Sequence, residues 1–170
     1  MMNKLQIQLP PNGPNIIGAT GGSGTRVVLG IVRRAGMYVG TEFNKADDAI
    51  SFLGHYTRWS ANLIENRHSG LPPEIEAQMI RELKTALEAH LEGFDSNQKQ
   101  PWGWKNPMSM YILPFFHTMF PQMNFIHVIR DGRDMAYSQN QGQLSRNGSL
   151  FLSTAERETW SQPVQSIALW

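Results

Sequence analysis

Short apolar runs alternate with segments of helical apolar spacing along this chain, and that alternation is the feature that most constrains its fold. Strands are predicted at residues 15–19, 37–40, 102–105 and 125–129, of which the last, β-branched and aromatic, is the clearest. Helices are predicted at residues 25–35, 47–66, 72–93 and 107–120, with another beginning near residue 131. This order favours an α/β fold with a parallel sheet flanked by helices, in which ligands bind at the carboxyl ends of the strands.

The other segments are predicted to be connections within a single domain, residues 1–170. Residues 95–100 are polar, and residues 141–149 are polar and contain glycine, so both are predicted loops, the second a mobile one. One helix is predicted for residues 153–170, with an apolar face that needs a partner. The five tryptophans and the methionine-rich segment 108–123 are predicted to lie in the core.

Charge and cysteine content exclude several classes of protein. Fifteen Lys and Arg against fourteen Asp and Glu give a formal charge of +1, so no nucleic-acid partner is expected and an anion site must come from local placement of charge. The absence of cysteine excludes disulfides and thiolate metal sites. Residues 1–15 lack the apolar segment of a signal peptide, and no stretch is long and apolar enough to span a bilayer. A cytoplasmic protein with no membrane partner is therefore expected.

The first predicted strand and helix are joined by a glycine-rich segment, Gly18-Ala19-Thr20-Gly21-Gly22-Ser23-Gly24-Thr25-Arg26. Small residues there let backbone N–H groups and a helix N-terminus approach an anion, so the segment is predicted to hold a phosphate. A plain tight turn is the alternative. The segment lacks the Gly-Lys-Ser/Thr of nucleoside-triphosphatase loops and the third glycine of the dinucleotide-binding pattern.

The most specific stretch begins in the last predicted strand and reads HVIRDGRDMAYS, from His127 to Ser138. A buried strand is predicted to end at Arg130, and Ser138 follows eight residues later on the next predicted helix. A guanidinium offers a planar fork of donors and a hydroxyl adds a neutral donor, so the two side chains could hold a phosphate monoester. The alternative is an i,i+4 ion pair between Arg130 and Asp134, with Ser138 on the surface.

In order and spacing, these two motifs resemble those of sulfotransferases that use 3′-phosphoadenosine-5′-phosphosulfate (PAPS), and the resemblance covers residues 15–139. The loop is similar to the family's 5′-phosphosulfate loop, which commonly reads Pro-Lys/Arg-Ser-Gly-Thr-Thr, but Gly22 replaces the basic residue and Arg26 the second threonine. Arg26 is expected to supply the displaced charge. The resemblance implies a P-loop-like sulfotransferase fold. It also implies a PAPS site made of Gly22, Ser23, Gly24, Thr25, Arg26, Arg130 and Ser138, the last two of which would bind the 3′-phosphate.

The same resemblance implies direct transfer of a sulfuryl group from PAPS to a hydroxyl or amine of a small-molecule, glycan or peptide acceptor, with no metal. Lys105, in Trp-Lys-Asn-Pro, matches a lysine beside the transferring group. Glu42 matches the catalytic glutamate of tyrosylprotein sulfotransferases, and His55 is the alternative base. An ordinary surface lysine and a solvated carboxylate are the alternatives for the first two. His117 and His127 are predicted to be core residues.

Two other functions stay open. A P-loop kinase would bind ATP with Mg²⁺, but its Gly-Lys-Ser/Thr motif is absent. The second is a non-catalytic nucleotide-binding fragment. Members of the sulfotransferase family continue well past the arginine–serine segment, whereas only residues 153–170 follow it here, so a chain truncated at its C-terminus, and inactive in isolation, is expected. The acceptor and the oligomeric state are left open, because acceptor pockets are built from variable loops.

Overall fold

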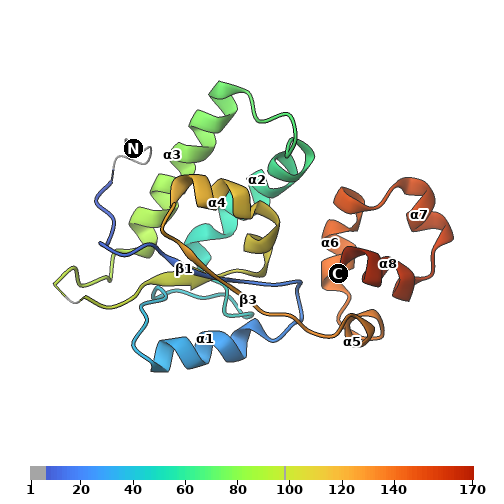
Figure 1. The fold of residues 1–170 in the computed structure, drawn as a ribbon, viewed down its shortest axis with the longest axis horizontal. Helices are drawn as coiled ribbons and strands as arrows, with labels where there is room; N and C mark the ends of the chain where they lie inside the picture. The colour runs from blue at the N-terminus through green and yellow to red at the C-terminus, as the bar shows by residue number, and fades with distance from the viewer. Residues whose placement is uncertain (1–6, 98) are drawn as a thin grey trace.

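The computed structural model describes residues 7–97 and 99–170, and it contains a parallel sheet of three strands (Figure 1). The strands are β1 (Asn15–Gly18), β2 (Gly103–Lys105) and β3 (Asn124–His127), in the order β2-β1-β3. Ile16 of the central strand pairs with Trp104 on one side and with Phe125 on the other. The predicted α/β class, a parallel sheet flanked by helices, is confirmed at this level.

Helices lie on both faces of the sheet and beyond its edge. In the part of the chain that the structure describes they are α1 (Thr25–Arg34), α2 (Leu53–Glu65), α3 (Pro73–His90), α4 (Leu113–Met119), α5 (Gly132–Ala136), α6 (Gly142–Phe151), α7 (Thr154–Thr159) and α8 (Gln162–Leu169). Two 3-10 helices, η1 (Ile50–Phe52) and η2 (Pro107–Ile112), directly precede α2 and α4. Figure 1 shows α1 on one face of the sheet, α2, α3 and α4 on the other, and α6, α7 and α8 grouped to one side.

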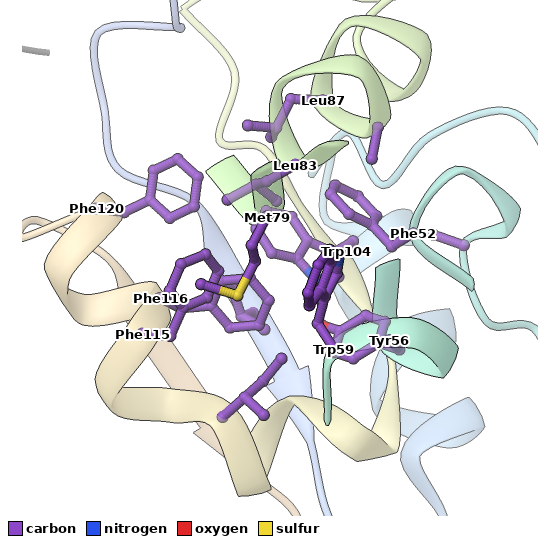
Figure 2. Close-up of a cluster of buried hydrophobic side chains, with 14 of the residues drawn as sticks. Phe52, Tyr56, Trp59, Met79, Leu83, Leu87, Trp104, Phe115, Phe116 and Phe120 are labelled. Atoms are coloured by element: carbon purple, nitrogen blue, oxygen red, sulfur yellow. The ribbon is translucent and has the colours of Figure 1, made fainter. Parts of the chain in front are cut away.

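The larger core lies between the sheet and the layer of α2, α3 and α4, and it is rich in aromatic rings (Figure 2). Trp104 of β2 is fully buried there, and its ring stacks on Phe52 with 4.3 Å between the centroids. The Phe116 ring meets the same indole edge-on at 5.5 Å. Aromatic pairs of this kind add about 0.5–1.5 kcal/mol beyond their buried area. They fix β2 and the segment that follows it.

A smaller core lies beneath α1, where Leu29 packs with Ile17 of the central strand and with Met37 and Val39. Helix α1 presents Val28 and Val32 to this cluster, whereas Val27 and Ile31 on its outer side are exposed. This packing fixes the helix that begins where the glycine-rich loop ends.

Two connections differ from their predictions. Residues 37–40 form no strand, and Tyr38 makes a single parallel bridge to Trp102 instead. Residues 141–149, predicted to be a mobile loop, belong from Gly142 onward to helix α6, with Gln141 as its N-cap. That helix buries Gln143 and Asn147. Its inward face is therefore polar, and apolar spacing could not reveal it.

Two predicted helices are each divided. Residues 107–120 form η2 and then α4, which has Pro114 in its first turn. Residues 153–170 form α7 and α8 rather than one helix, and α8 packs on α5 and α6. Trp160 and Trp170 are 37% and 50% exposed, so the prediction that all tryptophans lie in the core is wrong for these two. No helix in the described part of the chain is long and apolar enough to cross a membrane.

The predictions of a buried last strand and of core histidines are also wrong. β3 is an edge strand whose residues are exposed or half-buried, because the described sheet has no fourth strand to cover it. His127 at its end is exposed for the same reason. His117 is exposed on the outer side of α4, whereas Phe116 beside it points into the core.

Candidate functional site

Parallel pairing brings the three predicted motifs to the same edge of the sheet. Ile17 of β1 is in register with Lys105, and Gly18 is in register with His127. Beyond this pair, the Val128 N–H donates to the Gly18 carbonyl at 3.0 Å. The three carboxyl ends lead into the glycine-rich loop, the lysine segment and the arginine segment. This edge is where ligands bind in parallel sheets.

The backbone of the glycine-rich loop is set by positive φ angles and by helix α6. Gly22 and Gly24 both have φ of 92°, a conformation that favours glycine, and Gly24 is the N-cap of α1. The Gly21 N–H donates to Oε1 of Gln143 at 3.2 Å, and a Cβ added at Gly21 would lie 2.6 Å from the same oxygen. The first N–H groups of α1 have no partner within the helix, so the loop ends in donors that favour an anion.

The side chains of the loop are less open than its backbone. The Ser23 hydroxyl donates to the Thr20 carbonyl at 2.7 Å, so it is occupied within the loop. Ser23 and Thr25 are both buried, whereas Arg26 in the first turn of α1 is exposed. Of the predicted phosphate-binding side chains in this loop, Arg26 is therefore the accessible one.

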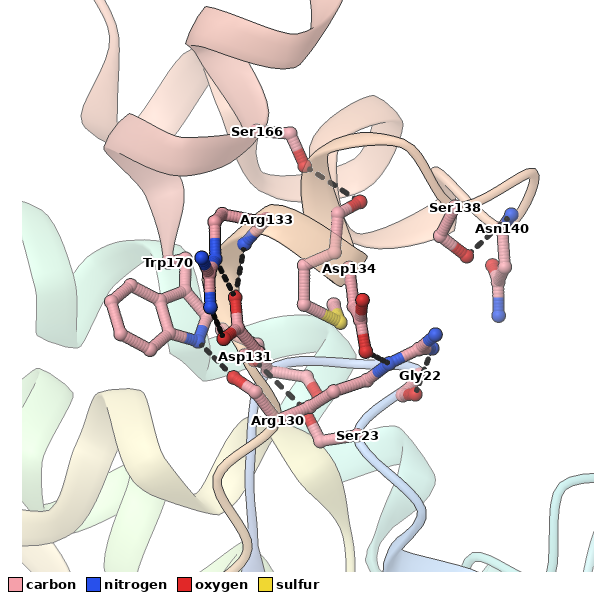
Figure 3. A network of polar contacts seen from close by, with 12 residues as sticks. Gly22, Ser23, Arg130, Asp131, Arg133, Asp134, Ser138, Asn140, Ser166 and Trp170 are labelled. Carbon is pink, nitrogen blue, oxygen red and sulfur yellow. Dashed lines mark hydrogen bonds and ion pairs between the residues drawn. The ribbon is translucent and has the colours of Figure 1, made fainter.

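Arg130 lies against the glycine-rich loop, as Figure 3 shows. Its Nη1 donates to the Gly22 carbonyl at 3.3 Å, which joins segments 108 residues apart. Its Nε lies 3.7 Å from Oδ2 of Asp134, the i,i+4 ion pair that was the alternative for this residue. Both side chains of that pair are partly solvent-exposed, so the pair contributes little stability, at most about 1 kcal/mol.

Ser138 lies beyond α5 and not on it. The helix ends at Ala136, so the expectation of a helical Ser138 is wrong. The Asn140 N–H donates to the Ser138 hydroxyl at 3.2 Å, and the hydroxyl points toward Asn140 in Figure 3. The Gln141 side chain donates to the Ser138 carbonyl at 2.6 Å, which fixes this turn.

The turn from β3 into α5 is held by an acidic cap and by the last residue of the chain. Asp131 accepts from the Arg133 N–H at 2.8 Å and also pairs with the Arg133 guanidinium. These hydrogen bonds hold the pKa of the Asp131 carboxyl far below its ordinary value. The Trp170 indole N–H donates to the Arg130 carbonyl at 2.8 Å. The backbone that carries Arg130 is therefore fixed from both sides.

Lys105 is buried at the end of β2, with its side chain 2% exposed, so it is not an ordinary surface lysine. Its ammonium lies 2.6 Å from Oδ1 of Asp48 and 2.7 Å from the Ala46 carbonyl. The other carboxylate oxygen of Asp48 accepts from the Asn44 amide at 3.2 Å. Buried charges are stable only when paired and hydrogen-bonded, and this pair meets both conditions.

The two predicted bases lie apart from this pair. Glu42 is exposed and its carbonyl accepts from the Ile50 N–H, at the start of a turn closed by a bridge between Phe43 and Ala49. His55 is buried and stacks on Phe115, with 5.8 Å between centroids. Neither ring nitrogen of His55 has a hydrogen-bond partner in the described part of the chain, and burial lowers the pKa of His55 to about 4. Their roles as bases stay predictions.

A cavity of about 380 Å³, here called the α2–α6 pocket, lies beside the glycine-rich loop and the Lys105–Asp48 pair. Its polar lining comes from the loop, the turn before η1, α2, the start of η2 and α6, and consists of Gly21, Asn44, Asp48, Tyr56, Thr57, Ser60, Asn106, Gln143, Arg146 and Asn147. Neither Glu42 nor His55 lines this cavity.

The sequence predictions missed Asp48 and the polar face of α6. Asp48 meets Lys105 across 57 residues, and a pair of this kind carries no local signal. In α6, Gln143 donates to the Tyr111 hydroxyl at 2.6 Å, and Asn147 donates to the Met108 sulfur at 3.3 Å. The i,i+4 spacing of these two amides is a signal of one helical face, but only once the helix itself is known.

Comparisons of the chain with models of known protein families, with curated proteins and with solved structures found no match. Within residues 7–97 and 99–170, no group of three or more His, Asp or Glu side chains is placed to hold a metal ion. The function is therefore inferred from the sequence motifs and from the geometry of this edge of the sheet.

Proposed function

We propose that this protein is a PAPS-dependent sulfotransferase. The observation that carries the proposal is the contact between Arg130 and the Gly22 carbonyl, which makes neighbours of two motifs separated by 108 residues. One motif resembles a 5′-phosphosulfate loop and the other a 3′-phosphate site. A single nucleotide that carries both groups would account for both motifs.

The 5′-phosphosulfate would bind at the glycine-rich loop. The N-terminus of α1 has no side-chain cap, so it offers backbone N–H donors and the positive end of the helix dipole. Arg26 in the first turn is exposed and adds a full positive charge where Gly22 leaves none. This combination replaces the lysine of a nucleoside-triphosphatase loop with an arginine on the helix.

The 3′-phosphate would bind Arg130 and Ser138. The guanidinium has five N–H donors. Its Nη1 donates to the Gly22 carbonyl and its Nε pairs with Asp134, so the other donors are left for a phosphate. Hydrogen bonds to a charged phosphate are worth about 1.5–3 kcal/mol, whereas an exposed ion pair is worth at most about 1 kcal/mol. A phosphate therefore competes successfully with Asp134 for Arg130. The Ser138 hydroxyl can rotate to donate, because the Asn140 N–H already supplies its accepted bond.

The proposed reaction is in-line transfer of the sulfuryl group to a hydroxyl or amine. Lys105 uses its ammonium for Asp48 and for the Ala46 carbonyl, so one of its three N–H donors is left for a sulfuryl oxygen. Charge that develops on those oxygens in the transition state would be stabilised by this fixed cation. Positioning of donor and acceptor supplies the rest of the rate.

Calorimetric titration with 3′-phosphoadenosine-5′-phosphate (PAP), ADP and Mg²⁺–ATP tests the proposal. We expect PAP to bind about ten- to a hundredfold more tightly than ADP, since PAP carries the 3′-phosphate that Arg130 would hold and ADP has no phosphate at that position. Equal binding of PAP and ADP would contradict the proposal. Tighter binding of Mg²⁺–ATP would favour a P-loop kinase, and PAP binding without sulfation of any acceptor would favour a non-catalytic binding protein.

A further inference from the structure

The α2–α6 pocket has the size and position of an acceptor site. Its volume of about 380 Å³ falls within the usual range of small-molecule sites, about 300–1,000 Å³. Gly21 of the glycine-rich loop lines it on one side and Asp48 of the buried pair lines it on another. A molecule in this pocket would therefore lie next to the group held by the loop.

The pocket contains a buried hydroxyl that has no hydrogen-bond partner among residues 7–97 and 99–170. Ser60 on α2 is 3% exposed, lines the pocket, and its Oγ makes no hydrogen bond to any described residue. Buried hydroxyls are almost always hydrogen-bonded, and leaving one unpaired is unfavourable. A polar group of a bound molecule would supply the missing partner.

The other side chains of the pocket indicate a neutral ligand with several hydroxyl groups. Thr57, Asn106 and Asn147 bring neutral donors and acceptors. The charge of Asp48 is balanced by Lys105 at 2.6 Å, so this carboxylate does not give the pocket a net negative charge. Arg146 is exposed and donates to the Gly142 carbonyl at 2.9 Å. The rest of the lining is apolar and consists of Leu53, Ala61, Pro107, Met108 and Leu150. A sugar suits this mixed lining, because it offers hydroxyl groups to the polar side chains and C–H groups to the apolar ones.

Asp48 is the carboxylate that faces this pocket. Lys105 contacts its Oδ1 and the Asn44 amide donates to its Oδ2 at 3.2 Å. A carboxylate accepts about four hydrogen bonds, so lone pairs of both oxygens are left for a ligand. Its side chain is 15% exposed, which leaves it accessible from the cavity that it lines.

From these observations, and on the basis of the proposed function, we infer that the α2–α6 pocket binds a small neutral polyhydroxylated acceptor and that Asp48 is its proton acceptor. The acceptor oxygen forms a bond to sulfur while the bond from sulfur to the 5′-phosphate oxygen breaks. The electron pair of the broken bond leaves with PAP, and the proton of the acceptor hydroxyl moves to Asp48. Asp48 is then a catalytic residue, Lys105 also positions it, and Ser60 and Thr57 determine specificity.

The first experiment tests the pocket without the nucleotide. Saturation-transfer NMR measures contact between the wild-type protein and two probes, methyl glucoside and trehalose. We expect a signal for at least one sugar, its loss in Thr57→Trp, and a weaker signal in Ser60→Ala. Thr57 is an exposed residue of α2, so a tryptophan there fills the pocket and leaves the core intact. If neither sugar gives a signal, or if Thr57→Trp leaves the signal unchanged, the pocket assignment is overturned.

The second experiment tests Asp48 by transfer of labelled sulfate from PAPS to the sugar that binds. Asp48→Asn should lower kcat about a hundredfold or more, with the dissociation constant of PAP within threefold of wild type. Asp47→Asn is the matched control, because it makes the same chemical change at an exposed neighbour whose φ of 58° asparagine tolerates. Unchanged kcat in Asp48→Asn would overturn the assignment of the base.

Two further results keep the inference separate from the proposed function. Near-ultraviolet circular dichroism and PAP affinity show whether Asp48→Asn is folded. If Asp48→Asn is not folded, the pocket assignment is tested by Ser60→Ala alone, which should lower the affinity for the sugar. If the protein does not bind PAP but contacts sugar, and Thr57→Trp removes that contact, the sulfotransferase proposal is wrong and the pocket is still a sugar site. If the protein binds PAP but contacts neither sugar, the pocket assignment is wrong and the proposed function is retained.

Discussion

Lys105 and Arg130 are two basic residues at the same edge of the sheet, on opposite sides of the central strand, and their surroundings are opposite. Lys105 is 2% exposed, with contacts of 2.6 and 2.7 Å to groups of the protein. Arg130 is 39% exposed, with contacts of 3.3 and 3.7 Å. The buried cation is committed to an internal carboxylate, whereas the exposed one keeps most of its donors for a ligand. Both residues are basic, so it is burial that determines which of the two cations contributes to the stability of the fold.

Lys105→Met is the substitution expected to have the largest effect on stability. It leaves Asp48 with no cation in a mostly buried position, so the free energy of unfolding should fall by about 3–5 kcal/mol. Urea denaturation measures the change. Lys105→Met combined with Asp48→Leu is the control, since it removes both charges and should recover much of the loss. If the single variant is as stable as wild type, Lys105 is not committed to the fold.

Two buried histidines extend the contrast to groups that burial keeps neutral, since His55 has no hydrogen-bond partner among the described residues and His90 bonds to the Gly103 carbonyl at 2.9 Å. Burial lowers the pKa of His55 and of His90 to about 4. The unfolded chain therefore takes up protons as the pH falls through about 6.5, while the native protein resists until about 4. Stability should fall over that interval, by at most about 3 kcal/mol for each residue. Thermal unfolding between pH 7 and pH 4 measures this dependence.

His55→Phe separates the contribution of His55 from that of His90. It should flatten the pH dependence and raise stability at pH 7 by about 1 kcal/mol, because two ring nitrogens without partners are removed beside Phe115. His68→Phe, at an exposed position, is the matched control and should change neither quantity. A pH dependence that persists unchanged in His55→Phe would show that His55 is not the group that titrates.

Arg130→Ala should change binding and leave stability nearly unaltered. Loss of the guanidinium should remove most of the ten- to hundredfold preference for PAP over ADP, and Ser138→Ala a smaller share. The free energy of unfolding should change by less than about 1 kcal/mol, because the ion pair with Asp134 is exposed. Arg133→Ala is the control, since it removes a neighbouring arginine with an exposed ion pair of its own. Equal effects of the two variants on PAP binding would break the contrast.

Arg26→Ala is expected to have the smallest effect on binding. Loss of an exposed cation in the first turn of α1 should weaken binding of PAP and of ADP alike by about fivefold, or about 1 kcal/mol, because both carry a 5′-phosphate. Arg34→Ala in the last turn of the same helix should leave both affinities unchanged. Titration calorimetry on the three proteins is sufficient. Wild-type affinity in Arg26→Ala would remove Arg26 from the phosphate site.

Strands and helices with a continuous apolar face were predictable from the sequence, and those with a polar inward face were not. The segment NIIG of β1 and the apolar stripe of α1 gave clear local signals. Helix α6 turns Gln143 and Asn147 inward, so its residues resemble a loop in composition. β3 has the composition of a buried strand but lies at an edge, because its exposure depends on which strands pair and not on its own residues.

The candidate site divides in the same way. The glycine-rich loop, Lys105 and Arg130 could be found because each follows a recognisable strand, and parallel pairing then brings them together. Asp48 could not, since its contact with Lys105 exists only in the folded chain. Ser60 belongs to no sequence motif, and it is a candidate because its hydroxyl has no hydrogen-bond partner among the described residues.

The order of strands has a consequence for how this protein is made. The central strand is the first to be synthesised, but its neighbours come much later: Asn15 bonds to Trp102 across 87 residues and to Asn124 across 109. Contacts this distant in sequence form slowly and late. Ile16 and Ile17, fully buried in the folded protein, have no strand to pair with until residues 103–105 have been synthesised, and the second neighbouring strand comes only with residues 124–127. A stall in translation before residue 103 leaves an apolar strand with both edges open, and a stall between residues 105 and 124 leaves one edge open, so the nascent chain is prone to aggregate at these stages.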